Sequence, residues 1–540
     1  MVFAGNVKFG KNVIENLTTG MYEDSKIIYR EYIQNAADSI DKALRDGLYE
    51  EDDEPSIEIE IFPDERLIKI TDNAYGIKAQ DIVKTLIDVA DSEKVKGVDK
   101  GFRGIGRLGG LGYCKLLKFI TTYPDENIQT TVIYDGELLQ KYLNDFSIKM
   151  DAEEILQKII TVQSDSCSAA SHYFIVELHG VRKDNDELLD PNKITRYVSE
   201  VAPLDYANKF YLRSKIYEYL EANGLKLTDY RVSVDGFDVL RDYTTKLYEK
   251  DSGADGARKQ YDEIAHLEFK DFRDDEDGRL IAWMWFGISR FDRQIPSKYN
   301  PMAGLKLLKE NIQIDNGAKI SRFFKEPRGN LYFIGEIHAV DKDLIPNGRR
   351  DYFEETPTRV IFETKLEAFI NDTLYQLYRD ASVVKSIYQS STKVKELREE
   401  YEQKSQNGFI NETEQKVLID EIKSKQDKWL KDREKVEKIK DKAKDNPILT
   451  QVINNIEKKY DNEVTISKLP ENGLNDKKIE KTAKKTSENQ DKTVLLTDKL
   501  TNLSRNERKL VERIYSVISK VLDPEKSQKL IHKIQSELQN

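Results

Sequence analysis

The chain has 540 residues, of which 39% are hydrophobic and 34% charged, and its net charge is −11. This length exceeds one hydrophobic core and predicts about three or four domains. No apolar run approaches the ~18 residues of a membrane span, and the first residues lack the regions of a secretory signal, so we expect a cytoplasmic protein with no membrane partner. Cys114 and Cys167 are too few for a disulfide framework and lie at no metal-ligand spacing. The acidic balance argues against a surface that is basic overall, and local basic stripes stay open.

The first part of the chain carries the signals of helices mixed with antiparallel strands. Apolar residues recur at helical spacing over 25–45, and a glycine with an acidic run closes this helix. Runs of alternating character at 57–61 and 67–70, with a Pro-Asp turn between them, predict a pair of strands. A glycine-rich segment at 100–112 leads into an apolar stretch at 116–123, interpreted as a helix end and a strand. Together these elements predict an α+β sandwich.

The remainder divides by composition. Strands are expected in a second α/β region at 230–234, 280–288, 304–314 and 331–340. A stretch dense in charged residues then predicts a long helical, partly coiled-coil arm with a break near Asn407 and Gly408. A polar linker and a short helical pair follow. The expected domains are 1–182, 183–378, 379–463 (the arm), 464–496 (the linker) and 497–540 (the helical pair).

Three polar residues share one face of the first long helix. Glu31, Asn35 and Asp38 are spaced i, i+4 and i+7. A solvated helix face would explain the two carboxylates without any function. An asparagine in mid-helix is a poor helix former and requires a further reason.

Two turn segments follow this helix. Residues 70–77, with Asp72 and Gly76, come directly after a strand and could by themselves be an ordinary Asp-Asn turn. Residues 101–112 contain six glycines in twelve positions and can present backbone N–H groups to phosphates. A glycine-rich loop alone is weak evidence, because tight packing explains many such loops.

In this order and at this spacing, the three segments resemble the Bergerat ATP-binding fold, which gyrase, heat-shock chaperones, histidine kinases and MutL share. The helix is similar to the N box of that fold, Asp72 to Gly76 to its DxGxG box, and Gly101 to Gly106 to its glycine-rich lid box. The resemblance implies a Bergerat-fold sandwich over about the first 180 residues, followed by a transducer-like or middle-like α/β domain. It also implies ATP and Mg²⁺ as ligands.

The resemblance assigns roles residue by residue. Glu31 would be the general base, Asn35 would coordinate Mg²⁺, and Asp72 would bind the adenine amino group, with Asp38 in support. Gly76 and Ile77 would lie against the base. The lid residues that would contact the phosphates are Ser92, Lys94, Gly101, Phe102, Arg103, Gly104, Ile105 and Gly106.

Two positions depart from the family pattern. Ala74 stands where the first glycine of the DxGxG box is usual, so the turn must avoid the left-handed region there. The threonine that usually completes the adenine contact is not evident, and residues 171–174 occupy its expected place.

The family also uses a cation from its second domain at the γ-phosphate. Residues 345–351 are similar to the Asn-x-Ser-Arg-Glu segment of the chaperone middle domain, which makes Arg350 the candidate and Arg349 its alternative. Lys306 and Lys309 are rivals, because gyrase and MutL use a lysine. A planar guanidinium suits a terminal phosphate and favours Arg350. Ordinary surface cations near turns would also explain these residues.

The branch of the superfamily stays open. The five histidines and the early N box argue against a histidine kinase, and no metal-binding module of a complete topoisomerase is evident. We expect an ATP hydrolase that closes as a homodimer on ATP binding, like the chaperone or MORC proteins. By analogy, we expect it to act in bacterial antiviral defence. The alternatives are a DNA-binding clamp of the MutL type and an ATP-regulated scaffold with little hydrolysis. The partner could be an effector protein, a client protein or DNA.

Overall fold

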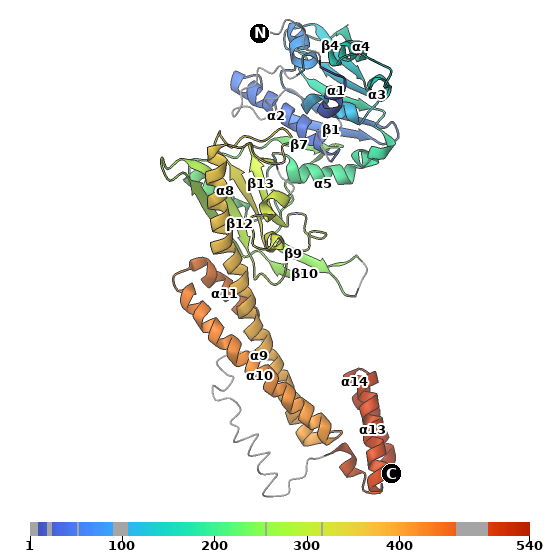
Figure 1. Ribbon diagram of the computed structural model, residues 1–540, viewed down its shortest axis with the longest axis vertical. Coiled ribbons are helices and arrows are strands. Elements are labelled where there is room, and N and C mark those ends of the chain that lie inside the picture. Colours follow the sequence, from blue (N-terminus) through green and yellow to red (C-terminus); the bar gives the residue numbers. More distant parts are fainter. Residues whose placement is uncertain are drawn as a thin grey trace, which may run out of the picture. The chain divides into compact units, whose positions relative to one another are not determined.

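The computed structural model describes residues 9–18, 24–50, 53–89, 106–253, 256–314, 317–460 and 495–539. The chain divides into two compact units. The first comprises Met1–Ser289 and Arg293–Tyr375, and the second Arg290–Asp292 and Gln376–Asn540. The first unit contains two β-sheets with helices, and the described elements of the second are helices (Figure 1). None of the helices in the described ranges is long and apolar enough to cross a bilayer.

The first sheet has eight strands in the order β5-β4-β3-β6-β2-β1-β7-β8. Its neighbouring strands are antiparallel except β1 and β7, which are parallel. The strands are β1 (Ser56–Phe62), β2 (Leu67–Asp72), β3 (Leu116–Thr121), β4 (Ile128–Asp135), β5 (Ile160–Ser166), β6 (Phe174–His179), β7 (Arg231–Val234) and β8 (Phe237–Asp238).

Helices pack against this sheet and share one hydrophobic core with it (Figure 1). The α-helices are α1 (Asn12–Leu17), α2 (Ile27–Asp46), α3 (Gly136–Asn144), α4 (Ala152–Ile159) and α5 (Pro191–Val201). The short helical turns are η1 (Ala79–Asp81), η2 (Val83–Ile87), η3 (Gly106–Gly112) and η4 (Lys183–Leu189). The sequence period of two in β1 has its cause here, because Ile57 and Ile59 are buried on the core side while Glu58 points to solvent.

Two sequence predictions need correction in this sheet. The strand expected at 230–234 forms as β7, but it pairs with β1 and not with the second α/β region. The first sheet and its core therefore include residues well beyond 182. The stretch at 116–123 contains the strand β3 and no helix end, because the preceding glycine-rich segment ends as the 3-10 helix η3.

The second sheet has five strands in the order β11-β12-β15-β13-β14, with a separate ribbon of β9 and β10. Its elements are α6 (Arg213–Ala222), β9 (Lys246–Lys250), β10 (Arg258–Glu263), β11 (His266–Arg273), β12 (Leu280–Ile288), β13 (Gly304–Lys309), β14 (Ile312–Gln313), α7 (Ala318–Ser321), η5 (Pro327–Tyr332), β15 (Ile334–Ala339), α8 (Pro357–Phe369) and η6 (Ile370–Leu374). The single strand expected at 304–314 is two strands joined by a turn, in which Glu310 and Asn311 have positive φ angles of 51° and 60°.

A buried ion pair connects the end of the first sheet region to the second sheet. Arg241 and Glu336 are both 2% exposed, and Arg241 Nη1 lies 2.8 Å from Glu336 Oε1. Arg241 Nη2 also donates to the carbonyl oxygens of Ala202 and Asn311. This guanidinium thus joins the segment after α5, the turn before β14 and strand β15.

The second oxygen of Glu336 is also satisfied. Glu336 Oε2 accepts hydrogen bonds from the Tyr206 hydroxyl and from Trp285 Nε1 at 3.2 Å, and it lies 3.1 Å from His338 Nε2. Burial raises the pKa of Glu336, but the contacts with Arg241, His338 and Tyr206 lower this pKa by more, so that it lies at about 2. The carboxylate is therefore ionised in the folded protein.

The helical unit folds back on itself. Its described elements are α9 (Tyr375–Asn407), α10 (Glu412–Ala443), α11 (Pro447–Tyr460), η8 (Leu496–Lys499), α13 (Arg505–Val521) and α14 (Pro524–Gln539). Hydrogen bonds from Ser386 to Asp432, Arg398 to Gln426 and Lys404 to Glu414 show that α9 and α10 are antiparallel. The break near Asn407 and Gly408 is confirmed, and Gly408 has a positive φ of 104°.

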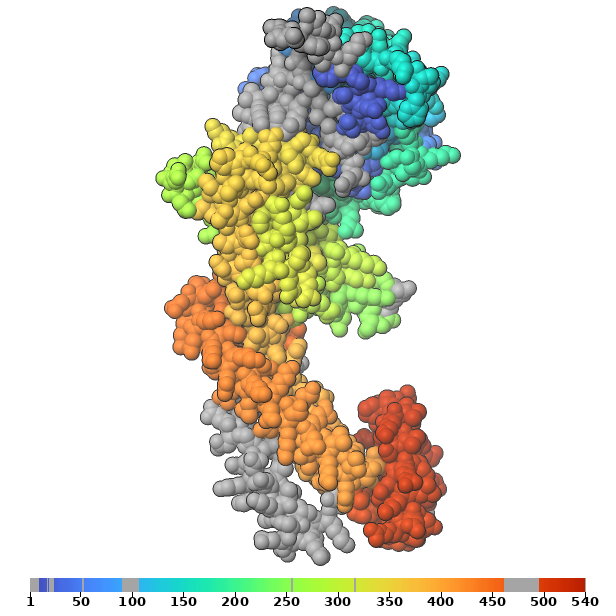
Figure 2. Space-filling model, in the orientation of Figure 1, coloured from blue at the N-terminus to red at the C-terminus, as the bar shows by residue number. Residues whose placement is uncertain are grey.

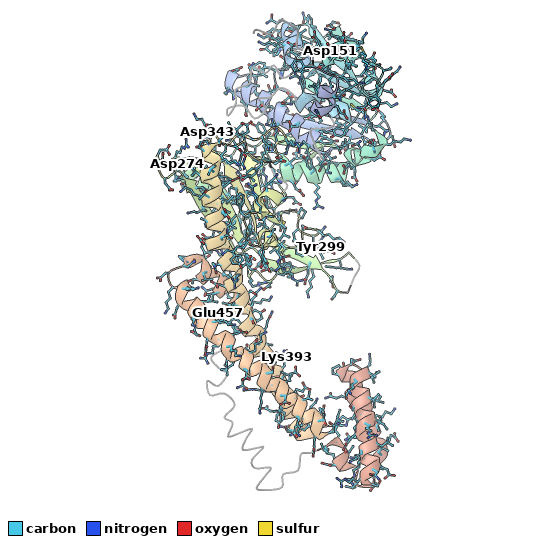
Figure 3. The ribbon with its side chains drawn as sticks, viewed as in Figure 1. Asp151, Asp274, Tyr299, Asp343, Lys393 and Glu457 are labelled. Atoms are coloured by element: carbon cyan, nitrogen blue, oxygen red, sulfur yellow. The ribbon has the colours of Figure 1, made fainter. Side chains whose placement is uncertain are left out.

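The shorter helices attach to the two ends of this hairpin. Glu457 of α11, labelled in Figure 3, accepts a hydrogen bond from Tyr388 of α9 at 2.9 Å and forms an ion pair with Lys440 of α10 at 2.9 Å. At the other end, Leu496 N donates to the Phe409 carbonyl at 2.8 Å, and Ile410 shares a core with α13 and α14. The linker expected at 464–496 lies almost wholly outside the described residues.

We expect Glu336→Gln to lower the free energy of unfolding by about 3–5 kcal/mol, because it leaves the buried Arg241 without a counter-charge. In the native protein, the folded pKa of Glu336 is depressed from 4.5 to about 2. Its stabilisation is therefore complete above pH 4.5 and is lost as the pH falls towards 2. Urea unfolding between pH 7 and 3 measures both effects, and an equal pH dependence in Glu336→Gln and the native protein would contradict this account.

Candidate functional site

The site is built on the N-terminal half of α2. This helix buries the residues of its apolar face, among them Ile33, Ala37 and Ile40, and ends at Gly47, which has a positive φ of 75°. Glu31 is 4% exposed, whereas Asn35 and Asp38 are half-buried. A carboxylate so deeply buried is not part of a solvated helix face, so it requires partners within the protein.

Two arginines provide those partners. Arg350 Nε lies 3.5 Å from Glu31 Oε1, and Arg30 Nη2 lies 3.4 Å from the same oxygen. Arg30 Nη1 also donates to the Arg350 carbonyl at 3.4 Å. The three side chains are between 5% and 12% exposed. A carboxylate between two guanidinium groups forms a mostly buried centre with a net positive charge, and such a centre can hold a further anion.

A tight turn places Arg350 at this position. Asn347 Nδ2 donates to Asp351 Oδ1 at 2.7 Å, and Asp351 N donates back to Asn347 Oδ1 at 3.2 Å. Arg350 N donates to the Asn347 carbonyl at 3.0 Å, and Arg350 itself has a positive φ of 53°. Such a conformation is uncommon for a residue with a side chain and persists only where the surroundings fix it. Asn347 and Asp351 fix it here.

The second part of the site is the turn after β2. Asp72 is 4% exposed, and its Oδ1 accepts a hydrogen bond from Ala74 N at 3.2 Å. Ala74 is fully buried and is not among the residues with positive φ, so alanine fits this turn without strain. Gly76 has a φ of 70°, and a Cβ there would overlap with the Thr122 carbonyl oxygen. Only glycine fits at this second position of the motif.

Strands β3 and β6 support this turn. Thr121 Oγ1 accepts a hydrogen bond from Ile77 N at 2.9 Å and donates to the Tyr173 carbonyl at 3.2 Å. His172 Nδ1 lies 3.0 Å from the Asn73 carbonyl oxygen and 3.2 Å from that of Ala74. Because both partners are acceptors, Nδ1 carries the proton. His172, from the segment expected to hold the missing threonine, thus contacts the turn that contains Asp72.

The C-terminal end of the expected lid lies against Glu31. A Cβ on Gly106 would come within 2.5 Å of Glu31 Oε2, so the backbone approaches the carboxylate closely there. Tyr32 fixes η3, because its hydroxyl donates to the Arg107 carbonyl at 3.0 Å and accepts from Gly110 N at 3.1 Å. The other expected lid residues, Ser92, Lys94, Gly101, Phe102, Arg103, Gly104 and Ile105, lie outside the described residues.

The rival cations lie elsewhere. Lys309 is 8% exposed, and its Nζ donates to the Asp341 carbonyl at 2.7 Å. This contact connects β13 to the segment after β15. Lys306 lies half-buried in the middle of β13, opposite Glu336 in the strand register. Arg349 is exposed beside Arg350. Of these candidates, the one whose side chain meets Glu31 in the described structure is Arg350.

Sequence reasoning did not single out Arg30, Tyr32 or Thr121. The first two are neighbours of Glu31 on α2, and the helical period gives no signal that their side chains turn towards the site. Thr121 ends an ordinary apolar strand. Its one signal was its place at the end of β3, where side chains of adjacent strands meet the turn of Gly76.

Comparison with known proteins identifies the type of domain that contains α2 and β2. Residues 24–191 match the family described as histidine kinase-, DNA gyrase B-, and HSP90-like ATPase. The chain is 36% identical over 77 residues to the chaperone protein HtpG of Halorhodospira halophila, which covers 13% of this chain and 12% of the relative. It is 37% identical over 90 residues to HtpG of Psychrobacter cryohalolentis, covering 16% and 13%.

A longer match has a lower identity. The chain is 25% identical over 226 residues to HtpG of Buchnera aphidicola subsp. Schizaphis graminum, which covers 38% of this chain and 34% of the relative. The matched part thus spans between about an eighth and a third of the relatives' own length. The similarity to these chaperones is therefore distant and partial.

We expect the free energy of unfolding of Gly76→Ala to be at least ~2 kcal/mol lower than that of Gly47→Ala, although both glycines have positive φ. At Gly47 the added Cβ meets nothing within 4 Å, whereas at Gly76 it meets the backbone of β3 and of the segment before β6. Urea unfolding of the two variants measures the difference. Equal losses would show that the close packing around Gly76 is not a constraint.

Proposed function

We propose, from the ATPase domain of the histidine kinase, gyrase B and HSP90-like type that residues 24–191 form, that this chain hydrolyses ATP with Mg²⁺ and converts the cycle into a chaperone-like conformational change. The observation that carries the proposal is the contact between Arg350 and Glu31. It brings a cation of the second sheet region to the acidic residue of the ATPase domain.

The residues fit the parts of ATP. Asp72 is a buried acceptor at the end of β2, where the adenine amino group would bind, and Gly76 keeps the neighbouring backbone close. Arg30 and Arg350 carry two positive charges around one carboxylate, which suits a terminal phosphate. Asn35, on the same face of α2, would bind to Mg²⁺ together with phosphate oxygens and water, and Mg²⁺ supplies charge neutralisation there.

The chemistry follows from competition for one guanidinium. A γ-phosphate near Arg350 would compete with Glu31 for its positive charge. Glu31, released from that contact, would accept a proton from water as the water oxygen attacks the γ-phosphorus. The bond between the γ-phosphorus and the β–γ bridging oxygen breaks, and ADP and phosphate leave. Arg350 stabilises the charge that develops on the transferred phosphoryl group.

The same competition supports a conformational output. Arg350 belongs to the turn at 347–351 of the second sheet region. A ligand that draws Arg350 away from Glu31 would therefore also move this turn. Closure of a homodimer around ATP and action on a protein client are the outputs that we propose, because the matched relatives are chaperone proteins. Lid closure would then limit the rate of turnover.

We expect Arg350→Ala to lower kcat for ATP hydrolysis by on the order of 10³-fold, because a cation at the terminal phosphate acts in the transition state. Arg349→Ala is the matched control, since its neighbouring side chain is exposed, and it should stay within about twofold of the native rate. Steady-state phosphate release measures both. Equal losses in the two variants, or no loss in either, would contradict the role of Arg350.

We expect Glu31→Gln to bind ATP at least as tightly as the native protein while losing hydrolysis by about 10²–10⁴-fold. The amide cannot accept the proton, and it no longer holds Arg350 by charge. Asp72→Asn should instead lose ATP binding. Calorimetric titration with ATP and phosphate release separate these effects, and normal hydrolysis by Glu31→Gln would refute the mechanism.

The client class is tested by stimulation. We expect unfolded protein to raise the ATPase rate of the native chain several-fold, and duplex DNA to leave it unchanged, because a client stabilises the closed state. Arg350→Ala, with its lowered rate of hydrolysis, gives the background rate of phosphate release. Stimulation by DNA alone would favour the clamp of the MutL type.

A further inference from the structure

Helix α13 exposes a continuous apolar stripe. Leu510, Ile514, Val517 and Val521 are 59%, 44%, 60% and 74% exposed. Their spacing of four, three and four residues places them along one face of the helix. Single exposed apolar side chains are common on proteins, but a stripe along one face is typical of an interaction surface. Figure 2 shows the α13–α14 pair in red.

The stripe is not part of the core of the helical pair. The opposite face of α13 buries Val511 and Tyr515 together with Ile531 of α14. A capping box of Ser504 and Glu507 closes the start of α13. The helix is therefore held by its own cap and by α14, and the stripe is left as a second apolar face.

The flank of the stripe is basic. Arg513 and Lys520 are exposed and follow Leu510 and Val517 by three residues, so they lie along one edge of the stripe. Within the part of the chain that the structure describes, neither forms an ion pair. The range 495–539 contains nine Lys and Arg against six Asp and Glu, in a chain whose net charge is −11. The stripe and its edge thus combine apolar surface with unpaired positive charge.

This charge pattern discriminates between occupants. The spacing of four, three and four reads the same in both directions, so two copies of α13 could align their apolar residues antiparallel. In that alignment, however, the edges with Arg513 and Lys520 would meet each other and repel. An amphipathic helix with acidic residues along its edge would fill the stripe and pair with both cations.

We propose that α13 is the docking site for an acidic amphipathic helix of a partner protein. Its apolar residues, spaced by three and four, cover Leu510, Ile514, Val517 and Val521. Its Glu or Asp residues pair with Arg513 and Lys520. This inference concerns the helical unit and does not depend on the proposed ATPase mechanism.

The test uses the full chain and two fluorescent designed peptides of about three heptads, with Leu at a and d. One peptide carries Glu at e and g, and the other carries Lys there. Fluorescence anisotropy should show the Glu peptide binding at least ~10-fold more tightly than the Lys peptide. Val517→Asp should abolish this binding. Val417→Asp is the matched control, because Val417 of α10 is equally exposed, at 59%, and lies outside the stripe.

A charge reversal separates recognition from a structural effect. Arg513→Glu should weaken the Glu peptide and strengthen the Lys peptide, which loss of folding cannot do. Equal binding of the two peptides, or no binding of either, would overturn the proposal. So would a dimer of the full chain that light scattering finds and that Val517→Asp dissociates, since the occupant would then be a second copy. Binding to phosphatidylserine vesicles that Val517→Asp abolishes would identify a membrane surface instead.

Discussion

The buried pair of Arg241 and Glu336 is the interaction on which the arrangement of the two sheets depends. Each of these charges would be costly to bury alone, and each is satisfied only by groups from several segments. Arg241 contacts the segment after α5 and the turn before β14, while Glu336 belongs to β15. A movement of one sheet relative to the other would therefore separate this pair and leave each buried charge without its partner.

The site near Glu31 makes use of this connection. Glu31 belongs to α2 of the first sheet region, and Arg350 to a turn that follows β15. Their contact at 3.5 Å requires the two sheet regions to keep a fixed relative position. The pair of Arg241 and Glu336 fixes that position from the core. The surroundings of Glu31 are electrostatically unbalanced, with two guanidinium groups for one carboxylate. That imbalance is what makes an anionic ligand favourable there.

The helical unit has a different physical character. Helices α9, α10 and α11 each bury apolar residues, among them Val384, Val436 and Val452, and hydrogen bonds and ion pairs between long side chains also connect these helices. Such surface pairs contribute little stability each. The exposed stripe of α13 adds apolar surface that the unit does not bury itself, so its full set of contacts includes a further molecule.

The sequence by itself determined the local elements and the residue types of the site. Helix α2 and strands β1 and β2 followed from periodicity, because the pattern of burial along one element is written in that element alone. The order of Glu31, Asp72 and the glycine-rich segment indicated the ATPase domain. The pairing of β7 with β1 did not follow, since alternation in a strand does not specify its neighbour. The choice among Arg350, Arg349 and Lys306 also required the fold, because more than 270 residues of chain separate them from Glu31 and only packing decides which side chain reaches it. The exposed face of α13 is likewise a tertiary property, since an amphipathic pattern shows two faces and only the position of α14 decides which of them is left to solvent.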